Sequence, residues 1–170
     1  SIRVTSKISG CSSELVDGIV NELDKKRGVM LSSRYEYPGR YTRWDIGFVN
    51  PPISIEAVAN KITISALNER GQVLLSAFLN ALENFQEVQI VSTDQNSFVC
   101  EVKQIENTFM EEDRSRMPHV MNVIRYLRDF FAFEDDRAGF YGVFGYDLGI
   151  DFMGVSRIHE RQQDRDLVLY

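Results

Sequence analysis

Cysteine is scarce in this sequence. Only Cys11 and Cys100 occur among 170 residues, and no C-x-x-C or Cys/His spacing accompanies them. Disulfide-stapled secreted domains and zinc sites both require closely arranged cysteines or histidines. The spacing therefore argues against both and favours reduced thiols in a cytoplasmic protein. Cys100, within SFVCEV, is expected to act as a small buried apolar residue.

The sequence also lacks an excess of positive charge, and it has no long apolar run. The formal net charge is -6 and the pI is about 5.0, whereas proteins that bind phosphate backbones rely on a basic surface. No apolar run approaches the roughly 20 residues that cross a bilayer, and SIRVTSKISG at the N-terminus has no signal-peptide core. We expect neither a nucleic acid nor a membrane as a partner.

Recognisable catalytic motifs are lacking as well. The two histidines, His119 and His159, have no ligand partner at a metal-binding interval, so capping or surface roles are expected for them. No G-x-S-x-G motif is present.

Two further patterns fail as sites. The acidic runs at 111–113 and 134–136 do not follow the ligand order of an EF-hand. The glycines at 139, 142 and 145 lack the Lys-Ser/Thr and the helix start of a phosphate loop, and close backbone approach or a bulge in a strand explains them better. The residues alone therefore predict a soluble domain without a self-contained active site.

What the chain does contain is ample material for a core. Apolar residues make up 44% and aromatic residues 11%, and 170 residues is close to the usual size of one domain. We therefore expect a single folded domain that spans residues 1–170.

Periodicity predicts an α+β fold. Apolar residues at helical spacing indicate helices over residues 12–26, 72–85 and 118–132, with Ser12 or Ser13 capping the first helix, Gly28 closing it, and Val73 among the inward residues of the second. Hairpins are predicted around Ala59-Asn60 and around 93–96, and strands over 29–33, from 42 to about 49, and 166–170, with a strand pair over 139–152. The predicted architecture is a mostly antiparallel, mixed β-sheet, in one or two layers, with about three helices packed outside.

The last predicted strand, DLVLY, occupies the end of the sequence. A strand at that place would leave the sheet with an unfinished edge, which complete proteins usually protect. We therefore expect further chain to follow Tyr170.

Residues 35–52, YEYPGRYTRWDIGFVNPP, concentrate five aromatic residues and three prolines. One interpretation is a structural corner, in which Pro38-Gly39 forms a turn and the aromatic rings fill the edge of a core. The other is a wall of a ligand site. The two interpretations are compatible.

Four local motifs resemble the N-terminal domain of anthranilate synthase component I, within the chorismate-utilising enzyme family. Met30-Leu31-Ser32-Ser33 stands where that family commonly has Leu-Leu-Glu-Ser, and Gly39-Arg40-Tyr41-Thr42 is similar to its Gly-Arg-Tyr-Ser. The stretches ALNERG at 66–71 and GFYGVFGYD at 139–147 complete the resemblance. YEYPGRYTRWD, FGYDLGIDF and RDLVLY look most like the form in which synthase and glutamine amidotransferase are fused.

The resemblance implies that the catalytic residues and the magnesium ligands belong to a chorismate-binding domain outside this chain, so no catalytic or metal residue is assigned here. It places on this chain part of a feedback site for tryptophan. Ser33 would provide a hydroxyl for the ammonium group, and Arg40 and Arg43 would provide cations for the carboxylate. Ser32 replaces the Glu of the family motif, so the motif itself carries no negative charge here.

Alternatives remain open. The chain could be the N-terminal domain of another chorismate enzyme, of the phenazine or para-aminobenzoate pathway, or a free-standing ligand-binding or interaction module. An apolar face that is normally covered by the catalytic domain would also permit a homo-oligomer.

Overall fold

The computed structural model describes residues 10, 12–33, 37, 44–103, 117–132, 139–153, 159 and 164–170, without the side chains of residues 33, 44 and 151–153. The chain divides into two compact units, Ser1–Asn50 and Pro51–Tyr170, and each is described by itself. Whether the two units associate into the single domain predicted for residues 1–170 stays a prediction.

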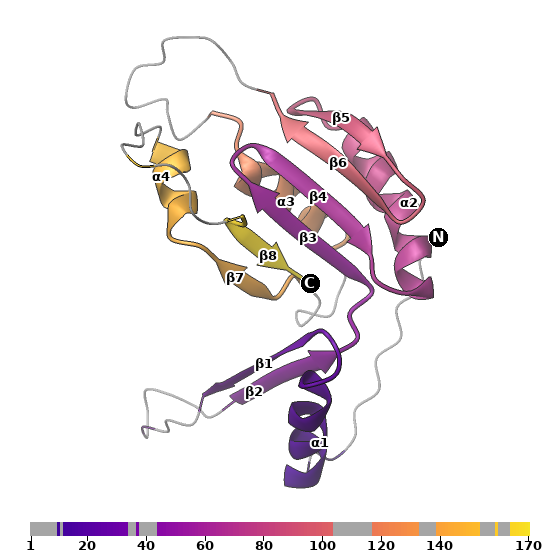
Figure 1. The fold of residues 1–170 in the computed structure, drawn as a ribbon, viewed down its shortest axis with the longest axis vertical. Helices are drawn as coiled ribbons and strands as arrows, with labels where there is room; N and C mark the ends of the chain where they lie inside the picture. Colours follow the sequence, from indigo (N-terminus) through magenta and orange to yellow (C-terminus); the bar gives the residue numbers. More distant parts are fainter. Residues whose placement is uncertain are drawn as a thin grey trace. The chain divides into compact units, whose positions relative to one another are not determined.

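The first unit is a helix followed by a two-stranded ribbon (Figure 1). Helix α1 spans Ser13–Leu23, and strands β1 (Gly28–Ser33) and β2 (Trp44–Val49) pair antiparallel, with Gly28 opposite Val49 and Ser33 opposite Trp44. The Ser12 side chain accepts a hydrogen bond from the backbone N–H of Leu15 at 3.4 Å. The predicted helix, its serine cap and both strands are confirmed.

The end of α1 differs from the prediction. The helix ends at Leu23 with Asp24 as its C-cap, and Gly28 is the first residue of β1. A Cβ atom at Gly28 would collide with the carbonyl oxygen of Phe48 and lie 2.6 Å from Cδ2 of Leu23. The glycine is therefore needed for close packing between helix and ribbon, and it does not close the helix.

The second unit contains a six-stranded antiparallel sheet. Its strands are β3 (Ile53–Val58), β4 (Lys61–Ala66), β5 (Val88–Thr93), β6 (Ser97–Val102), β7 (Gly142–Phe144) and β8 (Leu167–Leu169), in the order β5-β6-β4-β3-β8-β7. The hairpins β3–β4 and β5–β6 are those predicted, and Ala59 turns the first with a φ of 52°. With the helices described below, these antiparallel sheets confirm the predicted α+β class.

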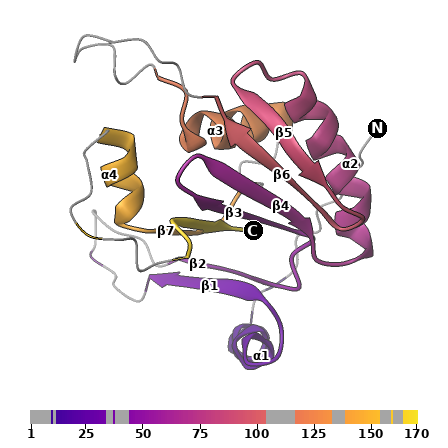
Figure 2. The same cartoon turned by 45° about the horizontal axis from the view of Figure 1, so that its top comes forward.

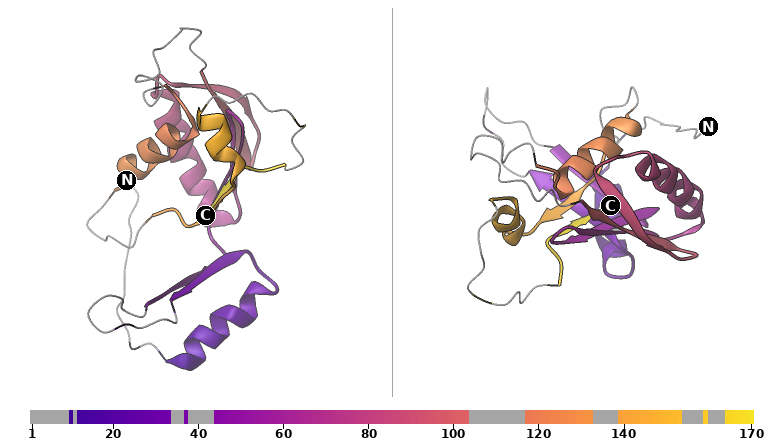
Figure 3. Two further views of the ribbon diagram at one scale, coloured as in Figure 1. Left: turned by 90° about the vertical axis from the view of Figure 1, so that its left-hand side faces the viewer. Right: turned by 90° about the horizontal axis from the view of Figure 1, so that it is seen from above.

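Helices α2 (Glu69–Glu83) and α3 (Val120–Phe130) cover one face of this sheet, as Figures 2 and 3 show. Their apolar stripes meet the inward residues of the strands in one core, and the largest of its fully buried side chains is Phe98. Between the helices, Phe85 stacks on Tyr126 with ring centroids 4.2 Å apart. The predicted phase of α2 was wrong at Val73, which is 70% exposed, because the buried stripe runs through Leu75, Phe78, Ala81 and Leu82.

Two predictions about the C-terminal third are corrected. Residues 139–152 do not form a strand pair, because β7 is followed by helix α4 (Asp147–Met153). The last strand is not an edge, because β8 lies between β3 and β7 (Figure 1). The close approach predicted for the glycines is confirmed at Gly142, where a Cβ atom would collide with the carbonyl oxygen of Val168.

Among the helices of the described residues, none combines the length and the apolar character needed to span a bilayer.

Candidate functional site

The ribbon of the first unit carries two of the four residues predicted for the effector site. Ser32 and Ser33 are the last two residues of β1, paired with Asp45 and Trp44 of β2. Arg40 and Arg43 lie outside the described residues, as do the acidic runs at 111–113 and 134–136 and all but Tyr37 of the 35–43 segment. Whether the four residues converge on one ligand therefore stays a prediction.

Ser32 has a partner that the sequence did not reveal. Its hydroxyl Oγ donates a hydrogen bond to the carboxylate oxygen Oδ1 of Asp45, and both side chains are exposed. The motif position that lacks a negative charge thus lies directly opposite a carboxylate. Asp45 falls within the strand predicted from residue 42 to about 49, but pairing it with Ser32 requires the register of the two strands.

The face of the ribbon that carries this pair also packs on α1. A Cβ atom at Gly47 would collide with Sδ of Met30 and would lie 3.4 Å from Cγ2 of Ile19 on the helix. Met30 and Gly47 are direct cross-strand partners, two positions from Ser32 and Asp45 respectively. A polar pair and a partly buried apolar patch therefore share one face.

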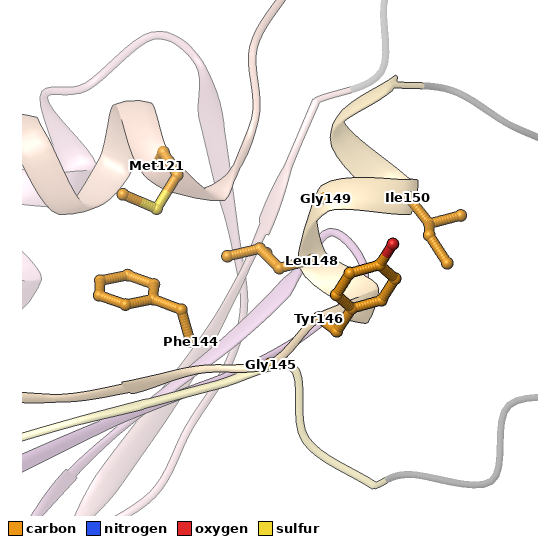
Figure 4. A pocket seen from close by; sticks show the side chains of 7 residues that line it. All are labelled: Met121, Phe144, Gly145, Tyr146, Leu148, Gly149 and Ile150. Atoms are coloured by element: carbon orange, nitrogen blue, oxygen red, sulfur yellow. The ribbon is translucent and has the colours of Figure 1, made fainter.

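A second candidate is a shallow hollow of about 530 Å³ in the second unit, between β7, α3 and α4. Figure 4 shows Leu148 of α4 pointing toward Met121 of α3 and Phe144 of β7. Gly145, Tyr146, Gly149 and Ile150 complete the lining, and among these described residues the Tyr146 hydroxyl is the only titratable side-chain group. Such a surface can bind apolar groups, but it offers no acid and base pair for catalysis.

This hollow was missed at the sequence level because its residues were assigned to a strand pair. The sequence signal was the aromatic residues of GFYGVFGYD, and the structure shows that two of them, Phe144 and Tyr146, are 55% and 90% exposed. Large apolar side chains with such exposure, grouped on one edge, are typical of contact surfaces.

Asp166 has a structural role. Its side chain is 1% exposed, and its Oδ2 accepts a hydrogen bond of 2.7 Å from the backbone N–H of Ala59, in the β3–β4 turn. Its own backbone N–H donates to the carbonyl of Ala57 at 2.7 Å. The residue thus fixes the start of β8 to the turn of the neighbouring hairpin.

His119 and Cys100 also serve the fold. Nδ1 of His119 accepts a hydrogen bond from the backbone N–H of Met121 at 3.1 Å and caps α3, which confirms the capping prediction. Burial, with the nearby Arg125 cation, lowers the pKa of His119, against a smaller opposing effect of Glu87. Burial raises the pKa of the Cys100 thiol to about 12, against a backbone hydrogen bond that lowers it, so this buried cysteine is an inert core residue as expected.

The described parts of the chain hold no group of three or more His, Cys, Asp or Glu residues that could bind a metal ion. No magnesium ligand is assigned to these residues.

No protein-family model matches this chain. A search of curated proteins finds an anthranilate synthase from Azospirillum brasilense that is 40% identical over 157 residues. The match covers 91% of this chain and 21% of the relative, so the chain spans about a fifth of that protein's length. The chain is thus similar, along nearly all of its length, to one part of an anthranilate synthase, which confirms the resemblance predicted from its motifs.

Proposed function

We propose that this chain is the N-terminal part of an anthranilate synthase, a lyase of tryptophan biosynthesis that converts chorismate and glutamine into anthranilate, pyruvate and glutamate. The observation that carries the proposal is the 40% identity to an anthranilate synthase across 91% of the chain. The motifs at 30–33, 66–71 and 139–147 agree with it. A cytoplasmic location is part of the proposal, and the free thiol of Cys100 is consistent with it.

The chain alone is proposed to be inactive. Eliminating pyruvate and adding an amino group require acid, base and metal groups that converge on one substrate. His119, whose pKa is lowered, caps a helix, and Cys100, whose pKa is raised, is a core thiol. We therefore place the catalytic residues and the expected magnesium on a chorismate-binding domain, with ammonia supplied by a glutamine amidotransferase domain or subunit.

The regulatory part of the proposal is a tryptophan site on the β1–β2 ribbon. Ser32 and Ser33 would contribute hydroxyl groups, and Arg40 and Arg43 would hold the effector's carboxylate. An indole ring requires a flat apolar surface beside these polar groups. The shared face of Ser32 and Met30 on the ribbon offers such a combination.

The hollow at β7 and α4 is the proposed contact surface for the catalytic domain. Val143, Phe144 and Tyr146 are 66%, 55% and 90% exposed, and contact with a further domain would remove this apolar surface from water at roughly 25 cal/mol per Å². In the isolated chain the same surface would favour a homo-oligomer.

Chain length and product analysis test this function. The isolated chain and the longer protein that contains it would be incubated with chorismate, glutamine and Mg²⁺, and anthranilate would be followed by its fluorescence. We expect turnover by the longer protein alone, inhibited by tryptophan. Anthranilate production by the isolated chain would refute its inactivity.

The same assay distinguishes the alternative functions. Para-aminobenzoate-type or phenazine-type products from the longer protein would establish another chorismate enzyme. A coding sequence without a chorismate-binding domain would favour a free-standing ligand-binding module.

A further inference from the structure

One exposed carboxylate on the ribbon, that of Asp45, lies directly opposite Ser32. We infer that Asp45, together with Ser32, binds the α-ammonium group of the tryptophan effector. The inference rests on the proposed regulatory function and adds to it a binding residue, Asp45, that the motifs did not indicate.

The register of the ribbon brings these two groups together. Ser32 and Asp45 are direct cross-strand partners, so their side chains leave the same face, with Cβ atoms roughly 5 Å apart. The Ser32 hydroxyl donates to Oδ1 of Asp45, and both side chains are exposed. The pair is therefore preorganised by the backbone and accessible to a ligand.

The pair has the acceptors that an ammonium group requires. An ammonium group has three N–H donors and no acceptor. Since the Ser32 hydroxyl proton is donated to Oδ1 of Asp45, Oγ retains its lone pairs and can accept one donor of the ammonium group. The carboxylate can accept another in a charge-assisted hydrogen bond. The serine thus both orients the carboxylate and contributes an acceptor.

The neighbouring residues suit the rest of an aromatic amino acid. Met30 and Gly47 lie two positions along their strands, about 7 Å from the polar pair. Sδ of Met30 lies over Gly47, and Cγ2 of Ile19, on α1, also lies close to Gly47. A thioether beside an aromatic ring is a favourable contact, so this face can hold an indole ring while the Ser32–Asp45 pair holds the ammonium group.

Calorimetric titration of the protein at its natural length, with two ligands, tests the inference. L-Tryptophan carries the ammonium group, and indole-3-propionate has the same ring and carboxylate without it. We expect Asp45→Asn to weaken tryptophan binding about tenfold, the loss of one charge-assisted hydrogen bond, and to leave indole-3-propionate binding unchanged. Asp17→Asn, which alters an exposed carboxylate on α1 of the same unit, should leave the affinity for both ligands unchanged.

A swap variant distinguishes the loss of a carboxylate from misfolding of the protein. Because positions 32 and 45 face each other, Ser32→Glu combined with Asp45→Ala returns a carboxylate to the same place, and we expect it to recover most of the affinity that Asp45→Ala loses. A swap variant that melts like the wild type but still binds as weakly as Asp45→Ala would overturn the inference.

The remaining outcomes separate this inference from the function on which it rests. A wild-type protein that does not bind tryptophan refutes the regulatory function itself. A wild-type protein that binds tryptophan, with Asp45→Asn unaffected or equally weakened toward both ligands, refutes only the ammonium-binding role of Asp45.

Discussion

Replacing Asp166 by alanine should destabilise the second unit more than any other removal of a single carboxylate among the described residues. The side chain is 1% exposed, and Oδ2 accepts the backbone N–H of Ala59 at 2.7 Å. The change removes a hydrogen bond to a carboxylate, worth about 1.5–3 kcal/mol, and leaves the backbone N–H of Ala59, an exposed turn residue, without this acceptor. Ala59 has a positive φ of 52°, so the turn has few alternative conformations in which to find another acceptor.

We therefore expect the free energy of unfolding to fall by about 1.5–3 kcal/mol, which corresponds to a melting temperature lower by roughly 6–12 °C for a unit of this size. Urea titration followed by far-ultraviolet circular dichroism measures the change. Asp166→Asn keeps a neutral acceptor at this position and should lose less than half as much.

Asp164→Ala is the matched control. This carboxylate lies two residues earlier, and its side chain is 87% exposed, so its removal should stay within about 0.5 kcal/mol of the wild type. If Asp166→Ala unfolds at the same urea concentration as this control, the hydrogen bond to the β3–β4 turn does not stabilise the sheet as argued.

Three further predictions concern groups whose roles the structure defines. Because the folded-state pKa of His119 is lowered, the folded chain binds this proton less readily than the unfolded chain, so the stability should be fully present above pH 6.5 and decrease as the pH falls below it. His119→Asn, which keeps a cap, should remove this part of the pH dependence in urea titrations. Gly142→Ala should lower the free energy of unfolding by more than about 2 kcal/mol in the same titrations, because its Cβ would collide with the Val168 carbonyl and lie 2.9 Å from Cα of Leu169. Gly149→Ala is the control and should be tolerated, because a Cβ at Gly149 meets no atom within 4 Å. Cys100, buried and with a pKa of about 12, should resist thiol reagents at pH 8 until the chain unfolds, and labelling at the rate of a free thiol would contradict its burial.

Local patterns in the sequence were sufficient for the hairpins. The β3–β4 pair follows from two alternating runs separated by Ala59-Asn60, and the structure confirms it with Val58 opposite Lys61. Both decisive features, the alternation and the turn, lie within a few residues of each other. The helix α3 was predicted for the same reason, since its apolar stripe repeats without interruption.

The helix α4 could not be predicted in this way. It has seven residues, of which Gly149 is the third, and glycine is unfavourable in a helix by about 1 kcal/mol. Its conformation is accompanied by packing of Leu148 beside Met121, a residue far away in the sequence. Tertiary contacts outweighed a local pattern that resembled the preceding strand.

The Ser32–Asp45 pair shows a different limit. Each residue could be assigned to a strand, but a shift of one position would place Asp45 opposite Leu31 or Ser33 and turn its side chain to the other face. The register was therefore needed before the carboxylate could be included in the proposed effector site.

The position of β8 links two motifs that the sequence presents separately. β8 pairs with β7 through Gly142 and Leu169, and with β3 through Ile55 and Leu169. Because the Gly142 position admits no side chain against the β8 backbone, the glycine spacing of GFYGVFGYD and the apolar run of DLVLY constrain each other. The hollow beside Phe144 then depends on β8 being in place, since β8 joins β7 to the rest of the sheet. A change that detaches β8 should therefore alter the proposed contact surface even where it touches none of the residues that line it.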